Sequence, residues 1–431
     1  MAMINRTIAP EIKNAVDFTF SLKPIEKWTL DNGVEVYALN AGEEEVVQLE
    51  WVFFAGNSHE PKNMVASATN FMLKNGTSTR NAFEINEHFE FYGSYLNRNC
   101  YNETSNITLH SLSKHVEALL PVVQELVTDA VFPQEEMDIF IQNTKQRLEV
   151  NLKKCDFVAN REIDVLIYGK DHPYGKYSSA ESLDALTRED LVQFYEQHYR
   201  QGSCILFVSG KLPANLQALL NQYFGQLKWS KATVKPKSPL ALPNALPANR
   251  QVRIMNDENG VQGAVRIARH FPNRHHPDFQ EVQVLNTLFG GFFGSRLMSN
   301  IREEKGYTYG IYSYLQNHVE QSAWMISTEA GRDVCEATIA EVYKEMEILR
   351  NEPVDEEELL LVRNFMLGSI LGDLDGPFQI MGRWKGYILH GDDESYFYRA
   401  IETIKTVSAE RLQELANQYL QQELFYEMVV V

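Results

Sequence analysis

Residues 83–99 read FEINEHFEFYGSYLNRN and residues 299–315 read SNIREEKGYTYGIYSYL, and this pair of stretches decides the fold of the chain. Each stretch has a segment of helical pattern, then a glycine, then residues typical of a strand. Gly93 of the first matches Gly306 of the second, about half the chain length further on. Self-similarity at one fixed offset is the mark of an internal repeat, so we expect two similar halves.

The same order of elements is expected around both stretches. In the first half we expect a strand and a helix before the stretch, and a strand and two helices after it, over 46–56, 61–77, 105–112, 115–131 and 132–148. The matching segments of the second half are 262–271, 278–297, 323–330, 335–349 and 353–367. Apolar residues alternate with period two in the strand segments, as in half-buried antiparallel strands. Helices between such strands predict an α+β domain, made twice.

Local signals refine this reading at several helix ends. Pro133 and Pro353 precede acidic residues where helices start, a place where a missing N–H costs nothing and carboxylates meet the positive end of the dipole. Pro121 lies inside an apolar helical pattern and either kinks that helix or starts a later one. The pair Asn75 and Gly76 predicts a helix C-cap.

The clearest break in the chain lies at residues 228–250, KWSKATVKPKSPLALPNALPANR, with prolines at 236, 239, 243 and 247. Prolines at this density fix φ and remove amide donors, so the segment is expected to be an extended linker. It divides the chain into a domain over 1–227 and a second over 251–431, each of ordinary domain size. A hinge between them is compatible with this composition.

Composition excludes several classes of function. The chain has 431 residues with 40 Lys and Arg against 58 Asp and Glu, a formal net charge of −18. Binding to the phosphate backbone needs a basic patch, so nucleic acid is not an expected partner. Apolar runs stay far below the ~20 residues of a membrane span, and the N-terminal residues lack an apolar export signal. Four scattered cysteines fit a reducing compartment, so we expect a cytoplasmic protein without a membrane partner.

A helical segment followed by Gly76-Thr77, the repeated halves and the REEKGYTY segment together carry a family resemblance. The chain resembles the M16 family of zinc metallopeptidases, which includes insulinase, pitrilysin and the mitochondrial processing peptidase. The resemblance spans essentially the whole chain. It implies two homologous α/β-roll domains of the LuxS and processing-peptidase type, each a mostly antiparallel sheet covered by helices, in a clamshell arrangement.

The zinc motif of the family, HxxEH, is degenerate in this chain. Alignment on Gly76-Thr77 places Ser67 and Phe71 at the two ligand histidines and Asn70 at the catalytic glutamate. Positions i, i+3 and i+4 share one helix face, which is why the motif can hold zinc and activate its water. A hydroxyl, an amide and a phenyl ring supply no such ligand or base. Glu149 lies near the third ligand position, and without partners we expect it to face solvent or form an ion pair.

Other residues that could form a metal site have simpler explanations. Glu84 and His88 lie off the apolar stripe of their helix, as a solvated acid–base pair would. His110 belongs to an expected strand and His115 opens a helix, so the sequence leaves their separation open. A loop holds the histidines His270, His275 and His276. We therefore expect no metal in this chain, although an independent peptidase with unusual ligands stays an alternative.

The second half has the stronger functional signal, in Arg302 and Tyr309. In the family such an arginine and tyrosine reach across a chamber and hold the substrate backbone, and the resemblance implies that role here. A guanidinium fork suits peptide carbonyls, and a phenol can donate to an oxyanion. The competing explanation is a salt bridge at Arg302 and a core position for Tyr309. The glycine-rich stretch 290–297 lacks a phosphate-loop pattern and is expected to be a turn between helices.

Loss of the zinc motif with retention of the arginine and tyrosine is the pattern of one subunit type in heterodimeric members. The resemblance thus implies a non-catalytic subunit that binds peptides and pairs with an HxxEH subunit. That partner would hold the zinc, and this chain would need no cofactor. The alternative is a homodimeric, inactive peptide-binding or scaffold protein of the same fold.

Overall fold

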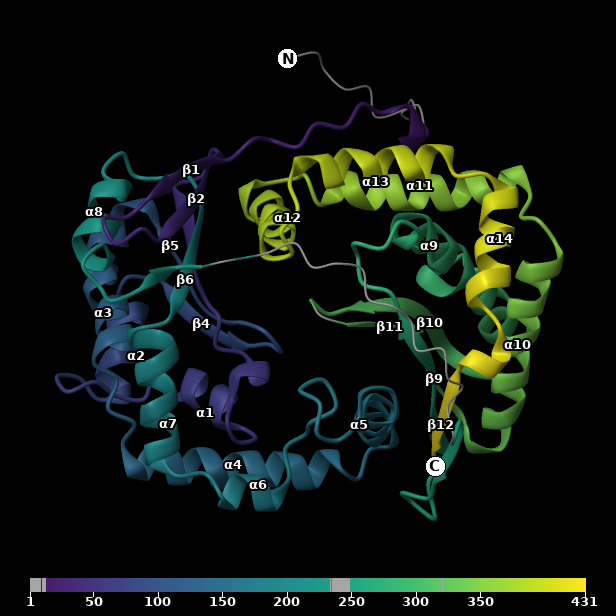
Figure 1. Cartoon of the computed structure of the whole chain (residues 1–431), viewed down its shortest axis with the longest axis horizontal. Helices are drawn as coiled ribbons and strands as arrows, with labels where there is room; N and C mark the ends of the chain where they lie inside the picture. Colours follow the sequence, from purple (N-terminus) through teal and green to yellow (C-terminus); the bar gives the residue numbers. More distant parts are fainter. Residues whose placement is uncertain (1–8, 10–12, 233, 235–248, 320) are drawn as a thin grey trace.

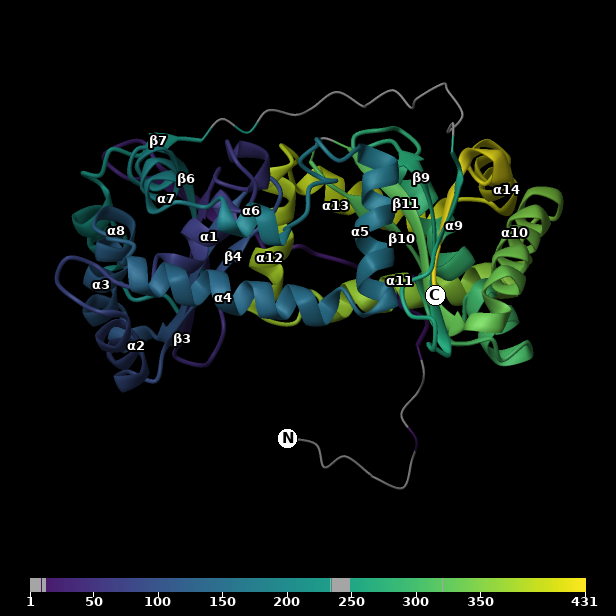
Figure 2. The same ribbon diagram turned by 90° about the horizontal axis from the view of Figure 1, so that it is seen from below.

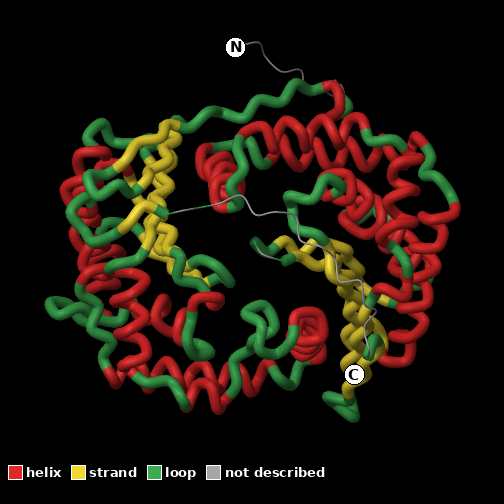
Figure 3. The backbone as a smooth tube through the Cα atoms, viewed as in Figure 1, coloured by secondary structure: helices red, strands yellow, loops and turns green. Residues whose placement is uncertain are grey.

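The computed structural model describes residues 9, 13–232, 234, 249–319 and 321–431. In it two β-sheets lie opposite each other, with helices arranged in a broad ring around them (Figure 1). One sheet lies in the first half of the chain and the other in the second, and Figure 3 shows helices around the outside of both. The expected α+β class is confirmed, and the two sheets, each covered by helices, are mixed rather than purely antiparallel.

The first sheet has the order β1-β2-β6-β3-β5-β4, with β7 beside β6. Its strands are β1 (Glu26–Thr29), β2 (Glu35–Asn40), β3 (Val46–Phe53), β4 (Tyr95–Cys100), β5 (Ser105–Leu112), β6 (Ser203–Gly210) and β7 (Ser230–Lys231). The second sheet has the order β10-β11-β9-β12-β8. Its strands are β8 (Gln251–Ile254), β9 (Gln262–Phe271), β10 (Thr308–Asn317), β11 (Ser322–Gly331) and β12 (Tyr426–Val430).

The two sheets repeat one topology. Read across the sheet, the second sheet has the order β10, β11, β9, β12, β8. The first sheet has the matching order β4, β5, β3, β6, β2. The parallel pair falls at the same place, between β2 and β6 and between β8 and β12, and the neighbouring pairs in that series are antiparallel. Gly93 and Gly306, which the sequence matches, both have a positive φ, of 60° and 65°. Both halves therefore follow the same path through a sheet of the same kind.

Fourteen α-helices of the described residues surround the sheets. Those of the first half are α1 (Val65–Met72), α2 (Ala82–Phe91), α3 (Val116–Thr128), α4 (Gln134–Asn151), α5 (Cys155–Tyr168), α6 (Ala180–Asp184), α7 (Arg188–Tyr195) and α8 (Leu216–Phe224). Those of the second half are α9 (Phe279–Asn286), α10 (Cys335–Asn351), α11 (Glu356–Gly372), α12 (Pro377–Leu389), α13 (Glu394–Thr406) and α14 (Ala409–Tyr419). No helix among the described residues has both the length and the apolar character needed to cross a bilayer.

The halves exchange helices, so that each sheet is covered partly by the other half. Helix α5 packs on β9 and β12, where Ala159 and Ile163 are buried with Ala268 and Met428 (Figure 2). Helix α12 lies against β2 and β6 of the first sheet. Apolar burial is the main stabilising term in folding, so a cut between the halves would expose core surface on both sides.

The N-terminal segment also joins the second half. The amide of Ala15 donates to Asn364 Oδ1 at 2.7 Å, and Trp384 Nε1 donates to the carbonyl of Lys23 at 2.9 Å. Phe20 and Leu22 are buried in a core formed mostly by the second half. The boundaries 1–227 and 251–431 stay a prediction, and the packing shows that the described segment from Ala15 to Lys23 contacts the far half.

Several local expectations need correction or fall outside the described residues. Helix α1 ends at Met72, and Gly76 instead forms an isolated bridge with Asn81, so the expected Asn75–Gly76 C-cap is wrong. The side-chain Nδ2 of Asn75 donates to Glu136 Oε2 on α4 at 2.7 Å, a tertiary hydrogen bond just beyond the end of α1. Pro121 lies within α3.

The predicted linker is ordered at its start. Trp229 is buried, and Ser230–Lys231 forms β7 beside β6, so these residues complete the first sheet. Most of the proline-rich segment, 233 and 235–248, lies outside the described residues.

Candidate functional site

The degenerate motif lies on α1, where Asn70 has a structural role. Its side chain is buried, and its Nδ2 donates to the carbonyl of Asn106 at 3.2 Å and to the hydroxyl of Tyr199 at 3.1 Å. Ser67 Oγ donates to the carbonyl of Met64 at 3.2 Å. Both polar side chains therefore bond the protein itself, as buried polar groups must.

Phe71, which the sequence alignment places at the second ligand position, packs against an aromatic ring and a guanidinium. Its ring lies 4.9 Å from that of Phe140 on α4, and the Arg98 guanidinium lies 5.2 Å from its centre. Arg98 also donates to the Phe71 carbonyl, and burial lowers the pKa of Arg98 to about 10. A cavity of about 690 Å³ opens beside this ring. Glu149, the candidate third ligand, is exposed on α4.

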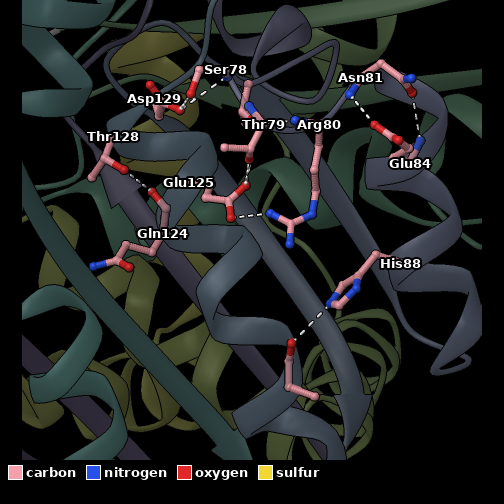
Figure 4. A network of polar contacts seen from close by, with 12 residues as sticks. Ser78, Thr79, Arg80, Asn81, Glu84, His88, Gln124, Glu125, Thr128 and Asp129 are labelled. Atoms are coloured by element: carbon pink, nitrogen blue, oxygen red, sulfur yellow. Dashed lines mark hydrogen bonds and ion pairs between the residues drawn. The ribbon is translucent and has the colours of Figure 1, made fainter.

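The segment that follows the motif is fixed to α3 by polar contacts (Figure 4). Arg80 forms an ion pair with Glu125, and Thr79 Oγ1 donates to the same carboxylate at 3.1 Å. The amide of Ser78 donates to Asp129 at 3.2 Å. These contacts hold the turn between α1 and α2, which fixes where the motif face points.

The expected Glu84–His88 pair is wrong. Glu84 forms a capping box with Asn81 at the start of α2, with both bonds at 2.9 Å. His88 Nε2 lies 3.1 Å from the carbonyl of Ala118 on α3 (Figure 4). The Glu84 carboxylate accepts a hydrogen bond at the start of α2, as the glutamate of a capping box does. The His88 imidazole contacts α3 instead.

The other candidate histidines lie in different places, each beside its own neighbours. His110 stacks on Tyr95 with the ring centres 4.6 Å apart, and His115 lies 5.1 Å from the Tyr92 ring. His275 lies 3.6 Å from Asp392, and the ring of His270 is 6.0 Å from that of Tyr168. His276 lies 3.9 Å from Asp278. In the part of the chain that is described, no three His, Cys, Asp or Glu side chains converge as metal ligands would.

Glu60 caps the N-terminal end of α1 from a buried position. Its Oε2 accepts from the amide of Ala66 at 3.1 Å. Burial raises the pKa of Glu60 to about 7, while the backbone hydrogen bonds act in the opposite direction. No pattern in the sequence singles out this residue.

The raised pKa makes stability depend on pH. Protonation of Glu60 favours the folded state, so its stabilising effect is full below pH 4.5 and is lost as pH rises through 7. At pH 8.5 we expect Glu60→Gln to raise the free energy of unfolding by about 2 kcal/mol relative to the unsubstituted chain. Each pKa unit is worth about 1.4 kcal/mol, and solvent screening removes part of the full value. At pH 5 the gain should nearly vanish. Urea denaturation at both pH values measures this gain, and Glu149→Gln, a substitution of an exposed glutamate, is the control. Equal effects of the two substitutions would contradict the prediction.

Arg302 and Tyr309 are brought together by the turn between them. Arg302 lies in the π-helical turn Met298–Glu304, and Gly306, with φ of 65°, reverses the chain into β10. The pairing of β10 with β11 shifts register between Thr308 and Ile311, and such a bulge re-aims a side chain. Tyr309 is 90% exposed, so it does not fill a core position.

The Arg302 guanidinium lies between two exposed rings. It is 4.4 Å from the centre of Phe293 and 5.2 Å from that of Tyr309, while Glu303 is 3.5 Å away. Cation–π contacts of this kind hold the planar group while its N–H edge stays accessible. Phe293 was not predicted as a site residue. Its one signal in the sequence is that a large apolar side chain lies between glycines in the expected turn.

A central cavity of about 800 Å³ lies between the halves. Asn102 Nδ2 lies 3.2 Å from His318 Nδ1, which joins the β4–β5 hairpin to the β10–β11 hairpin across it. Burial lowers the pKa of both His318 and His390 to about 4, so both imidazoles on its wall are neutral near pH 7. Among the described residues that line this cavity, neither the motif positions of α1 nor Arg302 and Tyr309 occur.

Comparison with known proteins gives a consistent assignment. Residues 185–366 match the family model described as "Peptidase M16 inactive domain". An uncharacterized zinc protease of Rickettsia felis is 23% identical over 79% of this chain and 82% of its own length. A probable mitochondrial-processing peptidase subunit beta of Schizosaccharomyces pombe is 23% identical over 64% of this chain and 60% of its own.

A solved structure shows the same fold. The crystal structure of a peptidase M16 inactive domain from Pseudomonas fluorescens superimposes with a TM-score of 0.83 at 24% identity. It covers 94% of this chain and 98% of its own. The sheet order and helical cover described above are thus those of a known architecture.

Proposed function

This chain belongs to the M16 peptidase family, and we propose that it is a non-catalytic subunit that binds peptides and pairs with a zinc-binding HxxEH subunit. One observation carries the proposal. The motif positions of α1 supply no ligand side chain, since Asn70 is bonded inside the core and Phe71 packs against Phe140, while Tyr309 is 90% exposed and the half-buried Arg302 lies beside it. The chain has lost the groups that cleave and kept groups that can hold a peptide.

We propose that the fold is two homologous domains in a clamshell, with boundaries at 1–227 and 251–431. The repeated strand order and the matching positive φ of Gly93 and Gly306 support this. The relative in Schizosaccharomyces pombe is named a subunit, which supports assembly with a second chain. The zinc and the water-activating glutamate would then belong to the partner.

Arg302 would bind substrate backbone through its free N–H edge. A guanidinium has five donors in a fixed fork, and the rings of Phe293 and Tyr309 restrict its orientation. The Tyr309 hydroxyl can donate to a peptide carbonyl from the adjacent strand end. Such preorganised donors stabilise developing negative charge in the partner's active site.

Replacing Arg302 tests the assignment. In the complex purified from its native host, Arg302→Ala should lower kcat/KM for peptide cleavage about 100- to 1000-fold, the size expected when one preorganised donor is lost. Arg302→Lys should recover only part, because an ammonium cannot form the two-pronged contact. Steady-state cleavage of an unfolded peptide measures both.

The control is Arg200→Ala, which removes an exposed arginine paired with Glu196 at the end of the first half. Its rate should match that of the natural complex. Unchanged kcat and KM for Arg302→Ala would show that the assigned role is wrong. Recovery of this chain without an HxxEH partner, as a homodimer that binds peptide but cleaves none, would favour the inactive scaffold alternative.

A further inference from the structure

A separate cavity of about 380 Å³ lies within the second half. It is enclosed by residues of α9, β10, α11, α12 and α13, which gather together in Figure 1. Much of its wall is apolar or aromatic, with Phe279, Leu315, Phe365, Ile370, Tyr387 and Tyr396. Its volume is at the lower end of the range for small-molecule sites. Neither the motif positions nor Arg302 and Tyr309 take part in it.

The charged residues on this wall are both arginines. Arg274 and Arg383 line the cavity, and no Asp or Glu is among its described lining residues. This is unusual in a chain with 58 acidic and 40 basic residues. The side chain of Arg274 is only 9% exposed, and its guanidinium lies 4.1 Å from the centre of the Tyr396 ring. A fixed positive charge therefore stands against an aromatic wall.

Both arginines have partners within the protein, but one buried donor of Arg383 is left unused. Arg274 Nε lies 2.9 Å from Asp392, and Arg274 Nη1 makes a long contact of 3.4 Å with the Gly386 carbonyl. Arg383 pairs at 2.6 Å with Asp373, whose side chain is 57% exposed. The Nε atom of Arg383 is buried without a hydrogen-bond partner among the described residues. Buried donors of this kind are costly unless a ligand completes them.

We propose that this cavity binds a small organic carboxylate with an apolar or aromatic body. Two guanidinium groups match the planar geometry of a carboxylate, and the aromatic wall accepts the apolar part. Asn286 and Ser369, also on the wall, add neutral polar groups. Asn317 lines this cavity and the central one, so the two are neighbours at the end of β10. The free C-terminal end of a peptide with an apolar last residue has the same chemistry as a free carboxylic acid.

Binding of N-acetylphenylalanine to the purified full chain tests this, with N-acetylphenylalanine amide as the uncharged probe. Calorimetric titration should show the acid binding at least 10-fold more tightly than the amide, the size of one charge-assisted hydrogen bond. Arg383→Gln should lower the affinity for N-acetylphenylalanine at least 10-fold. Arg399→Gln, an exposed arginine outside the cavity, should leave it unchanged.

Ala400→Phe is a second variant that fills the cavity and leaves both arginines in place. It should abolish binding of the acid, and circular dichroism with urea unfolding shows that each variant is folded. Tripeptides ending in phenylalanine, with a free or an amidated C-terminus, separate the sources. Binding of the free-ended peptide identifies peptide termini as ligands, whereas binding of the acetylated amino acid alone restricts the site to small acids.

Equal affinity for the acid and the amide would overturn the proposal. So would unchanged acid binding by both folded variants, Arg383→Gln and Ala400→Phe. These outcomes are independent of the peptidase partner, because they are measured on this chain alone.

Discussion

Lys385→Met is expected to destabilise the folded chain by about 3 to 5 kcal/mol, the range for breaking a buried ion pair from one side. Lys385 on α12 contacts both carboxylate oxygens of Glu50 on β3, at 2.9 and 2.8 Å. The Glu50 side chain is only 6% exposed. With Lys385 removed, Asn106 is the remaining donor beside the Glu50 carboxylate, and the negative charge of Glu50 stays buried. The pair joins the exchanged helix of the second half to the first sheet, so its loss acts on the contact between the halves.

Urea denaturation at pH 7 measures this cost. The double variant Glu50→Gln with Lys385→Met should recover most of it, because a neutral amide tolerates the buried position and still accepts from Asn106. Lys344→Ala is the matched control. It breaks an exposed pair with Glu341 at 3.4 Å and should cost less than about 1 kcal/mol. If Lys385→Met costs no more than this control, the pair does not hold α12 in place.

Asn70→Asp is expected to cost about 3 kcal/mol, the second large effect, from lost hydrogen bonds and a buried charge. The substitution keeps the shape and removes the donor. A carboxylate at this position would face the carbonyl of Asn106, to which Asn70 now donates, within a fully covered site. The tyrosine hydroxyl of Tyr199 would have to turn to donate instead of accept.

Thermal and urea unfolding measure the cost, with Ser67→Ala as control on the same helix. Ser67 bonds a carbonyl of the preceding turn and is only partly buried, so its loss should cost under about 1 kcal/mol. Equal stability of Asn70→Asp and the natural chain would show that the motif position has no structural role.

Much of the fold could be predicted from local pattern. The strands SNITLHSL and QGAVRIARHF coincide with β5 and β9 to the residue, because alternation of apolar and polar side chains is a local property. The start of α10 at Cys335 was likewise placed correctly. The end of α1 was not, because the bond from Asn75 to Glu136 depends on a helix that comes much later in the chain.

The candidate site divides in the same way. Loss of ligand chemistry at Ser67, Asn70 and Phe71 is evident from residue types alone. The stacking of Phe293 on Arg302 could not be predicted, because it depends on how a turn between glycines folds back on the π-helical segment. The two arginines of the separate cavity are far apart in sequence, so their convergence is a tertiary property.

The sequence by itself determined the repeated order of elements, the α+β class, the residue types at Ser67, Asn70 and Phe71, and the resemblance to the M16 family. These follow from periodicity and residue type, which each segment carries without its neighbours. Only the tertiary structure decided that α5 and α12 cross between the halves, that the segment from Ala15 to Lys23 packs on the far half, and that Asn70 bonds the core. An apolar helix face specifies that it must be buried, but burial is non-directional, so the sequence leaves open which sheet will cover it.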